Sequence, residues 1–139
     1  MCDWRQLNKY TVKNAFALPN VEQLLDQLNG TKWFTRLDLS QGFHQIRLVD
    51  DDSEKSTITT RYGNYKWQVM PFGMSNAPST FSAVMSEMLL PFQDKICLNF
   101  MDDILIYGKG SFDEHMAEVR QILTALRDNK FYCNPDKCI

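Results

Sequence analysis

The sequence predicts an α+β fold, an antiparallel sheet backed by helices. Three segments, at residues 21–28, 78–90 and 112–129, carry apolar residues at helical spacing, and short apolar runs between them suit strands. Two pairs of these runs lie close enough along the chain to form hairpins, in which neighbouring strands are antiparallel. Helices interleaved with such hairpins favour a sheet covered on one face, as in split βαβ arrangements.

Each predicted helix has signals for its start and its end. The first follows Asn20, a good N-cap residue, and stops before Gly30. The second stops at Pro91, which cannot continue a helix. The third begins with Ser111 and Glu114 at the spacing of a capping box. Because these signals agree with the apolar periodicity, we expect all three helices.

Six strands are predicted from short runs rich in β-branched and aromatic residues. They cover residues 33–39, 44–49, 56–61, 65–70, 96–100 and 104–107. Gly63 and Asn64 suit the turn between the third and fourth strands. Only Met101, Asp102 and Asp103 separate the last two strands, which places the two acids at or beside the tip of a hairpin.

Composition limits the chain to one domain or a part of one. It has 139 residues, 44% hydrophobic and 23% charged, enough for a single core. No apolar run is long enough to cross a membrane and the start lacks a signal-like segment, so we expect an intracellular protein without a membrane partner. The net charge of −2 and pI near 5.6 indicate no overall basic field. The four cysteines form no CxxC pair, which favours free thiols over a zinc or redox motif.

Acidic residues inside apolar segments predict a metal site. Asp102 and Asp103 stand between two apolar runs, and Asp38 stands inside another. An ionised carboxylate buried without a partner is unfavourable, so such a placement calls for a cation. Carboxylates that hold two magnesium ions are the usual centre of phosphoryl transfer. The other acidic run, residues 50–52, leads into a polar stretch and is predicted to be a solvated turn.

Six ordered blocks give the chain a resemblance to a known family. They are DWRQLNK (3–9), TVKN (11–14), FTRLDLSQGFHQI (34–46), RYG (61–63), VMPFGMSNAPSTF (69–81) and FMDDILI (100–106). In order and spacing they resemble the reverse transcriptases, and among these the gypsy-type long-terminal-repeat retrotransposons, from end to end. A lone Asp-Asp pair would carry little weight, whereas six blocks together are specific.

The resemblance implies a right-hand polymerase palm with part of the fingers. The fingers parts would be residues 1–13 and 46–76, and the palm parts residues 14–45 and 77–139. Thumb and RNase H are expected to be absent from the chain, together with the arginine of the fingers that binds the triphosphate. We therefore expect the 139-residue piece alone to bind primer and template weakly and to polymerise little or not at all.

The resemblance also implies the catalytic residues. Asp38, Asp102 and Asp103 would be catalytic, with Asp38 and Asp102 bridging two magnesium ions and Asp103 more peripheral. The carbonyl of Leu39 would complete a metal shell, and manganese could substitute for magnesium. The reaction would be transfer of a deoxynucleotide to a primer 3′-hydroxyl by an RNA-directed DNA polymerase within a retroelement polyprotein.

The nucleotide and template contacts follow from the same resemblance. The nucleotide-binding residues would be Ser40, Gln41, Gly42, Phe43, Phe72 and Gly73, and the template and primer contacts Asn76, Pro78, Phe100 and Met101. Phe43 would lie beneath the sugar and exclude a 2′-hydroxyl. The family usually has tyrosine at position 100, so Phe100 lacks a hydroxyl that could contact primer or template.

The implied partners are an RNA or DNA template with primer, deoxynucleoside triphosphates, and the thumb, RNase H and integrase of a polyprotein. The expected location is a cytoplasmic virus-like particle, or the nucleus after import, without secretion. Two other interpretations stay open, a non-catalytic or repurposed retroelement relic and a pararetroviral polymerase. An RNA-templated RNA polymerase fits poorly, because Phe43 would oppose ribonucleotides.

Overall fold

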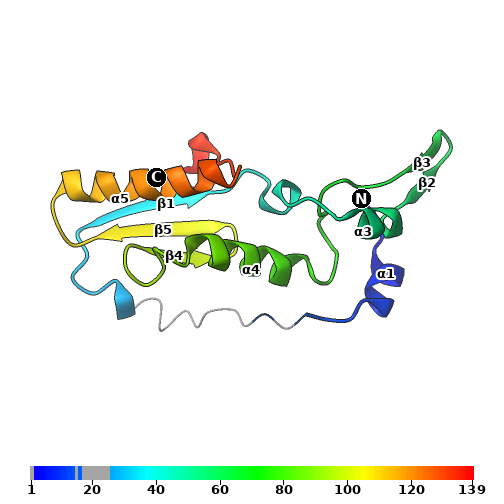
Figure 1. Cartoon of the computed structure of the whole chain (residues 1–139), viewed down its shortest axis with the longest axis horizontal. Coiled ribbons are helices and arrows are strands. Elements are labelled where there is room, and N and C mark those ends of the chain that lie inside the picture. Colours follow the sequence, from blue (N-terminus) through cyan, green and yellow to red (C-terminus); the bar gives the residue numbers. More distant parts are fainter. Residues whose placement is uncertain (1, 15, 17–25) are drawn as a thin grey trace.

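The computed structural model describes residues 2–14, 16 and 26–139. The molecule is elongated (Figure 1). One end holds a three-stranded sheet with helices α4 and α5, and the other end holds helices α1 and α3 with a small β-hairpin. Among the described residues no helix combines the length and the apolar character needed to cross a membrane.

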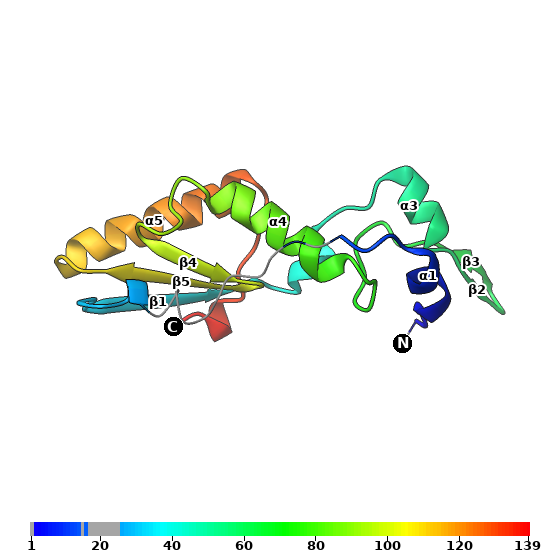
Figure 2. The same cartoon turned by 90° about the horizontal axis from the view of Figure 1, so that it is seen from below.

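The main sheet has the strand order β1-β5-β4, with both pairs antiparallel. Its strands are β1 (Trp33–Asp38), β4 (Cys97–Phe100) and β5 (Asp103–Gly108). Helices α4 (Ala77–Leu89) and α5 (Phe112–Asp128) lie on the same face of this sheet, as Figure 2 shows. The predicted α+β fold, with an antiparallel sheet backed by helices, is confirmed.

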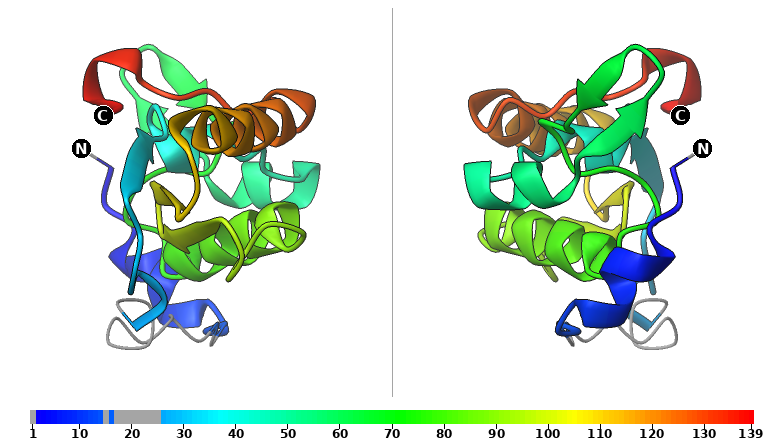
Figure 3. Two further views of the ribbon diagram at one scale, coloured as in Figure 1. Left: turned by 90° about the vertical axis from the view of Figure 1, so that its left-hand side faces the viewer. Right: turned by 90° about the vertical axis from the view of Figure 1, so that its right-hand side faces the viewer.

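The core lies between the sheet and these two helices. Side chains that alternate along the strands, such as Leu37, Ile104 and Ile106, point toward the helices and are buried. The helices contribute residues spaced three or four apart. These are Phe81, Met85 and Leu89 from α4, and Val119, Ile122 and Leu126 from α5. The opposite face of the sheet is turned away from α4 and α5, as Figure 3 shows. On that face Leu98 and Tyr107 are buried, whereas Phe34 and Phe100 are exposed.

Shorter elements form the other end of the molecule. They are α1 (Arg5–Tyr10), the 3-10 helix η1 (Gly42–Gln45), α3 (Asp50–Lys55), β2 (Ile58–Thr60) and β3 (Gly63–Tyr65). A last 3-10 helix, η2 (Pro135–Lys137), lies near the C-terminus beside the main sheet.

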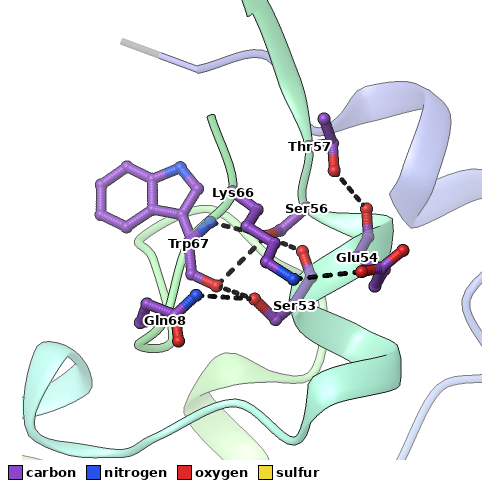
Figure 4. A network of polar contacts seen from close by, with 7 residues as sticks. All are labelled: Ser53, Glu54, Ser56, Thr57, Lys66, Trp67 and Gln68. Carbon is purple, nitrogen blue, oxygen red and sulfur yellow. Dashed lines mark hydrogen bonds and ion pairs between the residues drawn. The ribbon is translucent and has the colours of Figure 1, made fainter. Parts of the chain in front are cut away.

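Two buried serines, Ser53 in α3 and Ser56 at its C-cap, hold the chain that follows the small hairpin (Figure 4). The Ser56 hydroxyl accepts a hydrogen bond from the Trp67 amide at 2.9 Å and donates to the Ser53 carbonyl at 2.6 Å. The Ser53 hydroxyl donates to the Trp67 carbonyl at 2.5 Å. Since buried backbone groups need partners, these hydroxyls replace the ladder bonds that a longer strand would supply.

Several predicted elements are confirmed. The strand at 33–39, the helix at 78–90, the hairpin over 96–107 and the helix at 112–129 all form, within one or two residues at each end. The helix predicted at 21–28 lies mostly outside the described residues. Of this segment only residues 26–28 are described, and Asp26 and Gln27 are helical.

Other predictions are wrong. The strand at 44–49 is instead η1 followed by a single bridge between Arg47 and Val69. The acidic run 50–52 is exposed to solvent, as predicted, but it forms the first turn of helix α3 and not a turn between strands. The helix dipole favours carboxylates at that end. The small hairpin forms with shorter strands, and residues 61–62 make its turn, so that Gly63 pairs with Thr60. Helix α1 was not predicted at all.

Candidate active site

Strand register brings Asp38 and Asp103 together. Asp38 is the direct antiparallel partner of Asp103 across β1 and β5, and Phe100 is the partner of Asp103 across β4 and β5. Directly opposed residues point to the same face of a sheet. This face is the one that α4 and α5 leave open, because the alternate residues Leu37 and Ile104 face the helices.

Asp102 lies in the turn that joins β4 to β5. The turn consists of Met101 and Asp102, and Met101 has a φ of 55°, as the first central residue of a tight hairpin turn often does. Methionine is an uncommon choice there, because a side chain is disfavoured in the left-handed region. The Leu39 amide donates to the Asp102 carbonyl at 3.2 Å, which fixes the hairpin tip beside the end of β1. The backbone thus brings all three aspartates to one corner of the sheet.

The three carboxylates differ in environment. Asp38 has a side chain that is 19% exposed, and its Oδ1 lies 3.5 Å from Nζ of Lys137. Asp102 and Asp103 are exposed at the hairpin tip. The prediction that these carboxylates are buried therefore holds for Asp38 only. It is wrong for Asp102 and Asp103, because side chains at a hairpin tip stay in contact with water.

The donor atoms at this corner suit magnesium, which prefers carboxylate and carbonyl oxygens. Across residues 2–14, 16 and 26–139, however, no three His, Cys, Asp or Glu side chains gather into a group that could hold one ion. Asp38 is directed to Lys137 instead. The structure thus places the backbone of the aspartates together, and their side chains would have to turn toward a shared ion.

Gly42 closes the corner from the side of η1. A Cβ atom at this position would lie 3.0 Å from Cζ of Phe81 and 3.4 Å from Cβ of Asp102. Gln41, just before it, has a φ of 51° and starts the 3-10 turn. The loop can approach Asp102 this closely because position 42 carries no side chain.

Phe43 and Phe72 form an aromatic cluster next to this loop. The Phe43 ring lies 5.0 Å from the Phe72 ring and 5.3 Å from the Phe81 ring, both edge to face. Phe81 is fully buried, Phe43 is half-buried and Phe72 is 56% exposed. Phe43 is therefore held by the core on one side, while Phe72 presents much of its ring to solvent.

Gln45 was not predicted and fixes the loop that precedes η1. Its Nε2 donates to the carbonyls of Ser40 and Tyr132 at 2.6 and 2.9 Å, and its Oε1 accepts from the Tyr132 amide at 2.7 Å. Ser40 itself donates its amide to the Tyr132 carbonyl at 2.9 Å. Gln45 lies within the 34–46 block, but only the fold shows that its partner is 87 residues away.

Two other predicted contact residues, Gly73 and Asn76, lie where the segment before α4 meets α1 and the residues after it. Asn8 donates to the Gly73 carbonyl at 2.9 Å and accepts from the Ser75 amide at 2.8 Å. Gly73 has a φ of 95°, and Trp4 packs where a side chain would be. The Asn76 side-chain amide donates to the Val12 carbonyl at 2.8 Å and accepts from the Asn14 amide at 3.0 Å. Pro78 is exposed at the second position of α4.

The C-terminal segment covers the free edge of β1. The backbone of Cys133 pairs with that of Leu39 in an isolated antiparallel β-bridge, and the Asn134 amide donates to the Asp38 carbonyl at 2.9 Å. Burial raises the pKa of the Cys133 thiol to about 11, and the neighbouring Cys138 thiol and Asp38 carboxylate add to the effect. Lys137, which sequence analysis also missed, comes to Asp38 through this segment.

The fold and this corner define a class of protein. The structure superimposes on the protease-reverse transcriptase of prototype foamy virus with a TM-score of 0.83, at 22% identity, over 98% of this chain and 18% of that one. A foamy viral protease-reverse transcriptase in complex with double-stranded DNA gives a TM-score of 0.87 at 21% identity, over 98% of this chain and 24% of that one. The chain therefore has a reverse transcriptase fold.

The family follows from sequence. Residues 1–139 match the family described as reverse transcriptase (RNA-dependent DNA polymerase), and the chain belongs to it. It is 37% identical over 136 residues to the Pol polyprotein of transposon 297 from Drosophila melanogaster, covering 98% of this chain and 13% of that protein. It is 36% identical to the Tf2-3 transposon polyprotein of Schizosaccharomyces pombe, covering 98% of this chain and 10% of that protein.

A shorter relative is an RNA-directed DNA polymerase homolog from Oenothera berteroana. It is 39% identical over 125 residues, which are 88% of this chain and 88% of that protein. The chain thus spans about an eighth of the transposon 297 polyprotein and most of the Oenothera relative. The predicted retrotransposon resemblance is confirmed.

Proposed function

We propose that this chain is the catalytic core of an RNA-directed DNA polymerase encoded by a retroelement. It would add deoxynucleotides to a primer 3′-hydroxyl and release pyrophosphate. The observation that carries the proposal is the strand register that sets Asp38 opposite Asp103, with Asp102 in the adjoining turn. The family supports the same reaction.

Asp38, Asp102, Asp103 and the Leu39 carbonyl are the residues that would hold magnesium or manganese. Bound divalent ions would neutralise the triphosphate and activate the primer hydroxyl. The protein would position these ligands, because Gly42 and the Leu39 amide keep the hairpin tip, with Asp102, against the loop after β1. Lys137 would give up its contact with Asp38 when an ion takes that place.

The nucleotide would lie against the loop after β1. Ser40, Gln41 and Gly42 offer backbone groups, and Phe43 and Phe72 offer ring surfaces beside them. Gly73 shapes the turn that follows Phe72. Asn76, Pro78, Phe100 and Met101 would contact template or primer, and the exposed Phe100 ring shares the open face with Asp38 and Asp103.

Metal binding by the chain itself tests this proposal. Manganese titration, followed by the loss of free-ion EPR signal, should show binding that Asp38→Asn and Asp102→Asn each weaken at least about tenfold, as loss of a charged ligand predicts. Asp51→Asn, a change in the exposed first turn of α3, is the matched control and should leave affinity unchanged. Equal binding by all four proteins would refute the assigned metal site.

Sugar selection provides a separate test of Phe43. In a polymerising form of the enzyme, Phe43→Val should raise ribonucleotide incorporation, because removing the ring opens space for a 2′-hydroxyl. Phe81 contacts Phe43 from the core side, so Phe81→Leu is a control for indirect repacking. Unchanged discrimination between ribo- and deoxynucleotides in the Phe43 variant would remove that residue from the proposed role.

A second candidate is a retroelement relic that folds but does not catalyse. The length of the Oenothera relative favours it, because a protein of similar extent occurs outside a long polyprotein. Metal binding without any primer extension, even with the flanking polyprotein regions supplied, would favour the relic. As an active enzyme, the parent would work with template, primer, deoxynucleoside triphosphates and further polyprotein domains, in a cytoplasmic particle or in the nucleus.

A further inference from the structure

A row of aromatic rings runs from the candidate active site to the small hairpin. The His44 ring centroid lies 4.9 Å from that of Phe72, edge to face, and 5.7 Å from that of Trp67, stacked with an interplanar angle of 30°. Phe72 also contacts Phe43 beside the candidate nucleotide site. Phe72 is 56% exposed, and His44 and Trp67 are half-buried. The row therefore presents ring surface to solvent between the aspartates and β2–β3.

Trp67 also lines a hollow in the small hairpin. The hollow has a volume of about 280 Å³, and its other lining residues are Ile58, Tyr65, Lys66 and Gln68. Ile58 and Tyr65 are direct partners across β2 and β3, so their side chains point to the same face. Pockets for small ligands start at roughly 300 Å³, so this hollow suits one flat ring system and not a larger ligand.

The backbone of Trp67 is held by hydroxyl groups on both sides of its Cα atom. Ser56 accepts a hydrogen bond from the Trp67 amide, and Ser53 donates one to the Trp67 carbonyl. Figure 4 shows the Trp67 ring pointing away from these serines and from Glu54. A ring on a fixed backbone has less freedom to lose when a ligand binds against it. The serines thus prepare Trp67 for contact with a ligand.

The charge of this part of the chain suits an anionic polymer. Residues 56–86 contain two basic residues, Arg61 and Lys66, and no carboxylate. Lys66 forms an ion pair with Glu54 at 3.0 Å, which partly neutralises it. Arg61 lies at the exposed turn of the hairpin, with its guanidinium 4.7 Å from the centre of the Tyr62 ring. The hairpin therefore combines a cation that can attract phosphate with rings on which bases can stack.

We propose that Tyr65 and Trp67 form a stacking site for an unpaired base of a template strand, with His44 covering one face of Trp67 and Arg61 near the phosphates. Stacking on aromatic rings accepts every base, so the site would hold a template of any sequence. The unpaired part of a template is the part not yet copied, which fits a site outside the metal corner. The inference rests on the proposed function only for the identity of the strand, because binding of an unpaired oligonucleotide requires no catalysis.

The first test is photochemical cross-linking of the full chain to an oligodeoxyuridylate with one iodouracil, a base that links to aromatic side chains stacked on it. Cross-linking also records weak binding, which we expect of this chain alone. Trypsin cleaves after Arg61 and Lys66, so adducts on Tyr65 and on Trp67 fall in different peptides, and fragmentation assigns the residue. We expect adducts on both residues. Adducts only elsewhere in the chain, or none, would overturn the proposal.

The second test measures affinity for a labelled oligodeoxythymidylate by fluorescence anisotropy. Trp67→Leu should weaken binding roughly fivefold or more, as the loss of one stacked base predicts, and Trp67→Phe should weaken it less because it keeps a ring. An abasic strand of equal length should bind the wild type and Trp67→Leu equally. Trp33→Leu is the matched control, because Trp33 is a partly exposed tryptophan that packs on Phe112 instead.

Two results would count against the site: equal binding of the abasic and the base-bearing strand by the wild type, or an unchanged affinity in Trp67→Leu. The first would leave attraction to phosphate as the whole interaction, and it does not depend on the folding of any variant. Manganese binding by the aspartates is measured separately. Loss of the stacking site would therefore leave the proposed reaction standing, and loss of metal binding would leave the stacking result to be judged by itself.

Discussion

Gly42 shows how a single residue sets the geometry of the candidate site. Its missing side chain lets the loop after β1 lie against both Phe81 and Asp102. The ring on one side belongs to the buried core, whereas the aspartate on the other side lies in the exposed turn. The position thus connects the packing of α4 to the place of a predicted metal ligand.

Gly42→Ala should lower the free energy of unfolding by about 1 to 3 kcal/mol, the usual cost of overpacking a core position. The added Cβ would lie 3.0 Å from the Phe81 ring, which must move. Urea denaturation measures the loss, and the same substitution in a Phe81→Leu background should cost less, because the shorter side chain leaves room. An equal loss in both backgrounds would contradict steric conflict with Phe81.

Among the elements, α5 follows its sequence signals most closely. The Ser111 amide donates to Oε2 of Glu114 at 2.7 Å, and the Glu114 amide donates to the Ser111 hydroxyl at 3.3 Å, so the predicted capping box is complete. The pKa of the Glu114 carboxyl is lowered below its ordinary value, first by the hydrogen bond it accepts from the Ser111 amide and then by the Ser111 side chain, because both favour the charged form. The helix start therefore depends on pH.

Replacing Glu114 by glutamine should remove this pH dependence. A lowered pKa in the folded state means that the carboxylate stabilises the protein above the ordinary value of 4.5, and that this contribution is lost as the pH falls through the lower folded value. The difference in free energy of unfolding between wild type and Glu114→Gln should shrink over that range in urea titrations. Glu87→Gln, at an exposed position of α4, should show no such change. A difference that stays constant with pH would argue against the capping carboxylate.

The whole molecule has a reverse transcriptase fold but little of the charge that holds nucleic acid. Its net charge is −2, and phosphate contacts by basic residues supply much of the affinity for a duplex. The solved relatives at 18% and 24% coverage are several times longer than this chain. Basic surface on further parts of a longer protein would add to that affinity.

We expect the 139-residue chain alone to bind a primer–template weakly and to extend it little or not at all. Fluorescence anisotropy with a labelled primer–template, at two salt concentrations, measures the binding, and a gel assay measures extension. Tight binding to the primer–template at physiological salt would contradict the prediction of weak binding. Robust extension that Asp102→Asn abolishes would confirm the chemistry while showing that the chain suffices.

Much of the fold was predictable because the signals act over short distances along the chain. The periodicity of Phe81, Met85 and Leu89 identified α4, and two short apolar runs around Met101 and Asp102 identified the hairpin. Residues 44–49 gave the opposite result, since η1 is stabilised by contacts between Gln45 and Tyr132 that no local pattern reveals. At these residues the hydrogen bonds between Gln45 and Tyr132 outweigh the local preference for a strand.

The sequence by itself determined the family, the paired acids of the hairpin and the limits of α4 and α5, because ordered motifs and near-neighbour contacts specify them. Only the tertiary structure decided that Asp38 stands opposite Asp103, that Asp102 and Asp103 are exposed, and that Lys137 and Cys133 lie beside β1. The physical reason is that strand register and edge pairing depend on the packing of segments dozens of residues apart. Such pairings are fixed when the sheet closes on its helices and not by any stretch of chain alone.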